Sequence, residues 1–273
     1  MTDDRAAAGA VALPCVWDAP RPYVHPLTTP AGAVLSVEAP ADHPWHHALW
    51  FTIKFVNGEN FWEEYGEFGT LRTTAVETAG DITTAHLDWI APDGESVRLR
   101  ETRELRTTSL GPDAYAIDWI ETLQVPVITE LDRTPFTTWG GYGGLTLRGA
   151  PDWADTVLRL DDGAARDRAL GEPSRWLSIA GTAPTGDASS AAPAGVTILD
   201  DPANPRSPTP WYASTRADTY GGGWANFVNA AFLWDAPLTV EADHPLRFRY
   251  RVLVHDGEWS TDRVEHEYAQ WTR

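Results

Sequence analysis

The stretch Leu-Arg-Phe-Arg-Tyr-Arg-Val-Leu-Val, residues 246–254, decides the fold class. Arginine and large apolar side chains alternate along it, and successive side chains of an extended strand point to opposite faces. One face of this stretch is therefore polar and the other apolar. We expect a half-buried β-strand whose apolar face packs against a core.

The same period of two recurs along the chain. Residues 114–123 alternate cleanly, and Ile117 and Trp119 or their neighbours are expected to face the core. Residues 97–105 place Thr, Arg and Glu between sparse apolar positions, which is typical of an exposed or edge strand. Asp93-Gly94, between two such runs, is a hairpin signal. Further strands are predicted at residues 34–37, 48–56, 71–77, 83–90, 145–148 and 195–199.

Only residues 260–268 predict a helix, because a Ser/Thr cap and acidic first turns favour one there. Residues 181–194 are rich in Ala, Ser, Pro and Gly and are predicted to form a mobile loop, while four prolines within residues 200–210 interrupt the sheet. No repeat of about 20–50 residues is visible, which argues against a propeller or solenoid. We expect one all-β domain over residues 1–273, a large antiparallel β-sandwich with a short C-terminal helix, loosely ordered over residues 1–15.

The composition is that of an acidic globular protein. The chain has 273 residues, 39 acidic side chains against 21 basic ones, and a formal net charge of -18. Binding to nucleic acid or to an anionic membrane needs a basic face, so the charge argues against both partners. The 14 tryptophans are unusually many. Trp89, Trp119 and Trp176 lie within alternating stretches and are expected in the core.

The start of the chain argues against export. Acidic residues directly after Met1 do not suit a secretory signal, and no later stretch approaches the ~18 apolar residues that cross a bilayer. Cys15 is the one cysteine, so no intrachain disulfide is possible. We expect Cys15 to be a small buried thiol rather than a nucleophile, and the protein to be cytoplasmic.

Histidines are concentrated in Asp-His-Pro-Trp-His-His-Ala-Leu-Trp-Phe, residues 42–51. Imidazole exchanges protons near neutral pH and is also the commonest metal ligand. In a strand His46 and His47 would face opposite sides, but Pro44 favours a loop in which both can converge with His43. The spacing matches no strong metal pattern, so no metal is predicted. The alternative is that these histidines cap loop backbone groups and pack on indoles.

Aromatic residues and carboxylates follow in Asn-Gly-Glu-Asn-Phe-Trp-Glu-Glu-Tyr-Gly, residues 57–66. The faces of Trp50 and Trp62 can stack on the C–H faces of sugars, while Glu63 and Glu64 can accept hydrogen bonds from sugar hydroxyls. The alternative is an amphipathic loop in which both glutamates are solvated.

Two glycine-rich stretches place further aromatic and polar residues together. Residues 137–148 contain Trp139, Tyr142 and Arg148, and they match neither a dinucleotide fingerprint nor a Walker loop. The alternative for this stretch is a tight, bulged β-corner. The other candidates are Trp224 and Asn226 within residues 218–229, and Arg21 and His25 near the start.

These motifs together resemble a bacterial family labelled methane oxygenase PmoA-like. The matching segments are Arg-Pro-Tyr and Pro-x-Gly in residues 21–32, Asp-His-x-x-His-His and Trp-Phe in residues 42–51, Asn-Gly and Phe-Trp in residues 57–62, Gly-Gly-Leu-x-Leu-Arg at 143–148, and Tyr-Arg-Val-x-Val-His-Asp-Gly at 250–257. The label does not fit, because a membrane oxygenase subunit needs apolar spans of about 20 residues. Members look similar in fold to the galactose mutarotase supersandwich, which implies histidines and a carboxylate on a concave sugar-binding face.

The leading hypothesis is a carbohydrate-active enzyme of the epimerase, mutarotase or lyase type, without a cofactor. His46 or His47 is expected to donate the proton, with His43 as its partner and Glu63 or Glu64 as the base. The first alternative is a non-catalytic carbohydrate-binding or sensing module, and the second is a metal-dependent oxygenase or hydrolase using His25, His43, His46 and His47. The residues expected to hold the sugar are Arg21, His25, Trp50, Trp62, Trp139, Tyr142, Arg148, Trp224 and Asn226.

Overall fold

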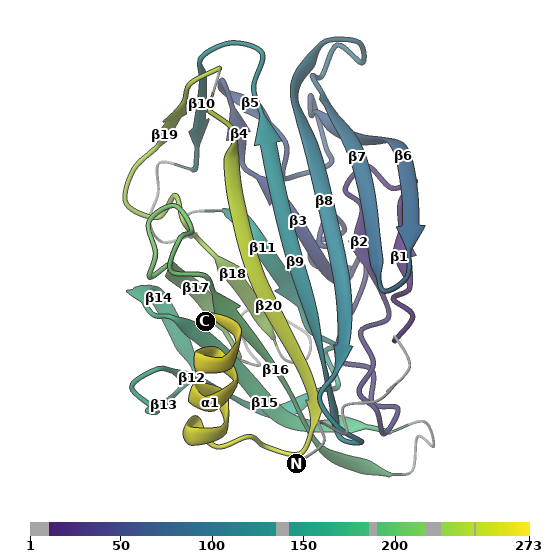
Figure 1. Cartoon of the computed structure of the whole chain (residues 1–273), viewed down its shortest axis with the longest axis vertical. Coiled ribbons are helices and arrows are strands. Elements are labelled where there is room, and N and C mark those ends of the chain that lie inside the picture. Colours follow the sequence, from purple (N-terminus) through teal and green to yellow (C-terminus); the bar gives the residue numbers. More distant parts are fainter. Residues whose placement is uncertain (1–10, 135–141, 186–189, 217–224, 243) are drawn as a thin grey trace.

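Two large antiparallel sheets lie face to face in the structure, a computed structural model that describes residues 11–134, 142–185, 190–216, 225–242 and 244–273 (Figure 1). Within these residues the first sheet has seven strands, in the order β1 (Cys15–Val16), β2 (Tyr23–Val24), β3 (Leu49–Ile53), β11 (Gly143–Arg148), β18 (Phe227–Ala230), β17 (Pro210–Ser214) and β14 (Arg168–Pro173). This confirms the predicted all-β sandwich.

The second sheet has nine strands in the described residues and is longer than the first (Figure 1). Its order is β13 (Ala165–Arg166), β12 (Ala154–Leu160), β15 (Trp176–Pro184), β16 (Ala191–Asp200), β20 (Leu246–Asp256), β9 (Ala114–Gln124), β8 (Val97–Ser109), β7 (Ile82–Ile90) and β6 (Thr70–Ala79). A small sheet at one end joins β19 (Leu238–Val240), β10 (Thr129–Asp132), β4 (Phe55–Val56) and β5 (Glu59–Asn60).

The core lies between the two large sheets, as the alternation on β20 predicts. Phe248, Tyr250 and Val252 are fully buried on its inward face. Phe248 meets Phe51 of β3, from the opposite sheet, with their ring centroids 5.5 Å apart. Burying an aromatic side chain of this size contributes about 1.5–3 kcal/mol to the stability of the fold. The apolar face of β20 therefore stabilises the packing of the two sheets. The expected core tryptophans Trp89, Trp119 and Trp176 are all buried.

The helix α1 (Thr261–Trp271) covers part of the outer face of the nine-stranded sheet (Figure 1). Ser260 caps it by accepting a hydrogen bond from the Arg263 backbone N–H, as the sequence predicts. Its buried residues Val264, Tyr268 and Trp271 pack in one cluster with Trp176 and Leu253. No helix in the described part of the chain is long and apolar enough to cross a membrane.

Three local predictions are wrong. Residues 34–37 form no strand and make isolated bridges instead, among them Ser36 with Gly149. β8, expected at an edge or exposed, lies between β7 and β9. Residues 181–194, expected to be a mobile loop, are mostly the paired ends of β15 and β16, with only residues 186–189 outside the described structure.

Candidate functional site

The outer face of the seven-stranded sheet, turned away from the core, carries the candidate site. Leu49, Phe51 and Ile53 of β3 point into the core, so Trp50 between them points outward. On the neighbouring strand β11 the same alternation turns Arg148 outward, opposite the core residue Leu147. Trp50 and Arg148 are nevertheless buried, which means that other segments cover this outer face.

Rings from several segments pack on this face in one aromatic cluster, which consists of Tyr23, Trp45, Trp50, Trp62, Tyr142, Tyr212, Phe227 and Trp234. Trp62 stacks on Tyr142 with centroids 4.7 Å apart and lies 5.6 Å from Trp50. Trp50 and Trp62 are only 1% and 2% exposed, so neither offers an open face for stacking on a sugar. Tyr142 and Trp45 are partly exposed and are better placed for that role.

The three clustered histidines lie in the loop before β3, as Pro44 predicts, and not in a strand. His43 stacks on His46 with ring centroids 4.6 Å apart. His46 is fully surrounded, by Trp50 at 5.4 Å and Phe227 at 5.2 Å among others. Burial, followed by the nearby His43 and Arg148, holds the pKa of His46 well below its ordinary value. His46 is therefore neutral, and it is a poor proton donor.

His43 is anchored by a carboxylate. Its Nδ1 lies 2.8 Å from Asp42 Oδ2, and Arg148 Nη2 donates to the same oxygen at 2.8 Å. Burial raises the pKa of Asp42, but the His43 hydrogen bond and the Arg148 charge outweigh it, so this pKa is lowered. An ionised Asp42 accepts only, so Nδ1 of His43 carries the proton of this hydrogen bond. The His43 side chain is 23% exposed, which gives it access to solvent.

His47 is anchored separately, by Glu64. His47 Nε2 donates to Glu64 Oε1 at 2.7 Å, while its Nδ1 lies 3.6 Å from Glu38 Oε1. The buried Arg21 lies on the other side of Glu64, with its Nη1 3.8 Å from the same oxygen. Burial lowers the pKa of Arg21 to about 10 although Glu64 and Glu63 raise it, so the guanidinium remains charged at neutral pH. Tyr23 stacks on the His47 ring at 5.3 Å.

Glu63 is paired with a different cation from its neighbour Glu64. Lys54, a buried residue between β3 and β4, donates to Glu63 and, at 3.3 Å, to Asn60. The side chains of Glu63 and Glu64 are only 14% and 20% exposed. The alternative interpretation, that both glutamates are simply solvated, is therefore wrong. The sequence analysis did not identify Lys54 as a site residue. The signal that could have identified it is its position as a single cation within an apolar strand.

Two predicted sugar-binding residues lie elsewhere. Asn226 is fully buried, where it donates to the carbonyls of Ala150 and Trp153 at 2.8 and 2.7 Å and accepts from Thr156 at 2.6 Å. These bonds commit its amide to the fold, so we remove Asn226 from the site. His25 bonds Ser36 at 2.9 Å in a separate groove. Trp139 and Trp224 lie outside the described residues.

A metal site would need clustered ligands, and a reactive cysteine would need a lowered pKa. Among the residues described, no group of three or more His, Cys, Asp or Glu side chains is placed to hold a metal ion. Burial raises the pKa of Cys15 to about 11, despite the opposing charge of Arg103. Cys15 is therefore a protonated thiol at neutral pH, as expected for a packing residue.

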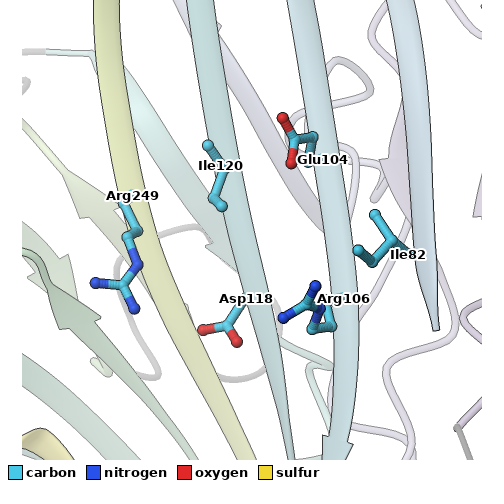
Figure 2. Close-up of a pocket in the computed structure, with 6 residues that line it drawn as sticks. All are labelled: Ile82, Glu104, Arg106, Asp118, Ile120 and Arg249. Atoms are coloured by element: carbon cyan, nitrogen blue, oxygen red, sulfur yellow. The ribbon is translucent and has the colours of Figure 1, made fainter. Parts of the chain in front are cut away.

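A shallow pocket on the outer face of the nine-stranded sheet is a weaker candidate. Figure 2 shows Asp118 of β9 between Arg249 of β20 and Arg106 of β8. Arg251 binds Asp118 through two hydrogen bonds of 2.8 and 2.6 Å, and Arg249 binds Asp201 at 2.6 Å. Asp118 and Arg249 are thereby committed to partners within the sheet and its neighbouring loop, which makes this pocket the weaker candidate.

Comparison with known protein families matches nearly the whole chain to one family. The model of a family of unknown function, DUF6807, matches residues 14–269. The chain belongs to this family. No curated protein matches the sequence. In this DUF6807 member, the match includes both large sheets and every described residue of the candidate site.

The arrangement can transfer protons. His43 combines an anchored tautomer with solvent access, and the His47–Glu64 pair adds a second imidazole and carboxylate. Three buried cations each lie beside a carboxylate of the site, Arg21 beside Glu64, Lys54 beside Glu63 and Arg148 beside Asp42. Acid–base pairs held in this way beside partly exposed aromatic rings suit a polar ligand with an apolar face.

Proposed function

We propose that this protein is a cytoplasmic carbohydrate-active enzyme of the epimerase, mutarotase or lyase type, working on the outer face of the seven-stranded sheet. The observation that carries the proposal is the His43–Asp42–Arg148 array at the edge of the aromatic cluster. The resemblance to the PmoA-like family and to the mutarotase supersandwich supports the same substrate class.

His43 takes the leading acid–base role in this proposal, in place of His46 or His47. His46 is neutral and buried, whereas His43 is accessible and oriented by Asp42. In a mutarotation, the Glu64 carboxylate accepts the proton of the anomeric hydroxyl, while His43 in its protonated form gives a proton to the ring oxygen as the ring opens. Closure on the other face returns both protons. The hydrogen bond from His47 Nε2 holds Glu64 for this role.

Proton-exchange NMR on a panel of neutral and acidic sugars tests this function. A well-placed general acid–base group contributes about 10²–10⁴-fold to a rate, so His43→Gln should slow anomer exchange or elimination at least about 100-fold. The matched control is His86→Gln, an exposed histidine on β7. Equal rates for wild type and His43→Gln across the panel would refute the proposal. Saturable sugar binding with no turnover by the wild type would instead favour the non-catalytic binding module.

A further inference from the structure

A groove opens at the rim of the seven-stranded sheet, beside the candidate site. Its walls come from residues 25–38, from the loop after β11 and from the end of β15. Polar and apolar side chains both line it, among them His25, Val34, Ser36, Glu38, Asp152 and Thr185. The groove is distinct from the aromatic cluster, and neither the family match nor the proposed function assigns it a role.

A hydrogen bond orients the ring of the groove histidine. Ser36 Oγ accepts from the Leu27 backbone N–H at 2.8 Å and lies 2.9 Å from His25 Nδ1. The hydroxyl oxygen can donate to Nδ1 or accept from it, and either bond holds the ring in place. Burial lowers the pKa of His25 although Glu38 raises it, which keeps the ring neutral. A neutral His25 has one N–H donor and one acceptor nitrogen.

The groove and the candidate site share one wall. Glu38 lines the groove and forms an isolated bridge with His47, whose Nδ1 is 3.6 Å from the Glu38 carboxylate. His47 Nδ1 is buried and makes no hydrogen bond to the described residues. Because the other ring nitrogen of His47 binds Glu64, a single imidazole separates a carboxylate of the groove from a carboxylate of the site.

The chemistry of the lining identifies the kind of ligand. His25 offers a ring nitrogen, and Glu38 and Asp152 offer acceptors. Thr185, whose hydroxyl lies 2.7 Å from that of Ser190, adds a further polar contact. Val34 and the neighbouring Pro151 supply apolar surface. A sugar ring matches this lining with its hydroxyls and C–H faces. The two carboxylates, with no cation among the described lining residues, disfavour an anionic ligand such as a uronate or phosphate.

We propose that the groove binds a second, neutral sugar unit of the same substrate, so that the substrate is a neutral disaccharide or longer chain. This inference rests on the proposed function. The reacting sugar lies against the aromatic cluster and His43, and the next unit lies across Glu38 in the groove. Binding energy from that second unit then selects chains over free monosaccharides.

Calorimetry with matched pairs of neutral sugars tests the inference, for example glucose against cellobiose and maltose, and galactose against lactose. Val34→Arg fills the groove and places a cation beside Glu38 and Asp152. Its control is Val76→Arg on β6, since Val34 and Val76 are 40% and 41% exposed. We expect Val34→Arg to weaken disaccharide binding at least tenfold and monosaccharide binding less than twofold. Asp152→Asn, a smaller change at an exposed residue, should weaken disaccharides in the same selective way.

The outcomes separate this inference from the proposed function. If the wild type binds a disaccharide no more tightly than its monosaccharide, or if Val34→Arg and Asp152→Asn leave disaccharide binding unchanged, the groove proposal is overturned while the sugar site stands. If both variants weaken both classes of sugar equally, the groove is no separate subsite and the proposal also fails. If no sugar binds to the wild type, the proposed function and the inference fall together.

Discussion

Two buried glutamates flank a single arginine in the core, and this cluster makes a sharp prediction about stability. Arg103 Nε donates to Oε1 of both Glu101 and Glu121 at 2.8 Å. Indole N–H groups of Trp89 and Trp119 complete the cluster at 2.7 and 2.6 Å. All three charged residues are buried. Two carboxylates share one cation here, so one carboxyl must remain protonated for the buried charges to balance.

Glu121 holds that proton. Burial raises its pKa well above the ordinary value, Arg103 opposes the shift, and Glu101 adds to it. Glu121→Gln mimics the protonated acid and keeps an acceptor for Trp119, so at pH 5 it should cost less than about 1 kcal/mol. Glu101→Gln should also be mild, because Glu121 can then ionise beside Arg103. The double variant leaves Arg103 without a counter-charge and should cost about 3–5 kcal/mol.

The pH dependence provides an independent measurement. Folded Glu121 binds a proton that the unfolded chain releases above about pH 4.3, so the contribution of this group to stability falls as pH rises from there toward the folded pKa. Glu121→Gln lacks this loss and should gain about 1.4 kcal/mol over wild type per pH unit in that window. Urea unfolding of the four proteins at pH 5, 6 and 7 measures both effects. Additive costs in the double variant, or parallel pH profiles for wild type and Glu121→Gln, would refute the shared proton.

Three further variants probe other buried contacts. Asn226→Ala leaves two buried carbonyls without a donor, so it should lower the free energy of unfolding in urea by at least about 2 kcal/mol. A loss below about 0.5 kcal/mol would contradict its structural role. Gly195→Ala places a Cβ 2.3 Å from the His255 ring, which is stacked on Trp259 with ring centroids 4.4 Å apart. It should lower the free energy of unfolding by about 1–3 kcal/mol. An unchanged melting temperature would show that the ring can move. Burial lowers the pKa of His255 to about 4, so the contribution of this group to stability should fall by about 3 kcal/mol between pH 6.5 and 4. His255→Asn should remove this part of the pH dependence relative to wild type.

Alternation predicted most of the strands because one face of each contacts an apolar core. It failed for β8, where Glu101 and Arg103 occupy inward positions. A buried ion cluster looks like an exposed face in the sequence, since alternation reports polarity and not burial. The pairing that satisfies those charges comes from Glu121 on β9 and lies beyond any local pattern.

Small residues misled the prediction at residues 181–194 for a related reason. Gly181 and Gly195 pair into β15 and β16, and a Cβ on Gly181 would lie 2.5 Å from the Ala154 carbonyl oxygen. The strands can approach each other this closely because glycine has no side chain. The sequence alone does not distinguish glycine and alanine in closely packed strands from glycine and alanine in a flexible loop.

The candidate site was predictable in composition but not in pairing. The sequence pattern brought His43, His47, Glu63 and Glu64 to attention, yet Glu64 binds His47 whereas Glu63 binds Lys54. Consecutive residues in a loop diverge by the local backbone angles, which no spacing rule fixes. Glu38 was not identified from the sequence. It belongs to the segment before the histidine loop and reaches His47 through an isolated bridge, which no sequence pattern indicates.

In the proposed function, His43 differs from the packing histidines by its exposure together with an ionised anchor. His255 and His46 are both buried, both stacked on aromatic or imidazole rings and both neutral, since burial lowers their pKa values. His43 stacks in the same way, but its partner Asp42 stays ionised through Arg148. Removing that cation should therefore act on His43 through Asp42, and it also removes one of the charges that lower the pKa of His46. Arg148→Met should slow sugar turnover through an altered pH profile, and a pH profile identical to wild type would separate Arg148 from the proton-transfer step.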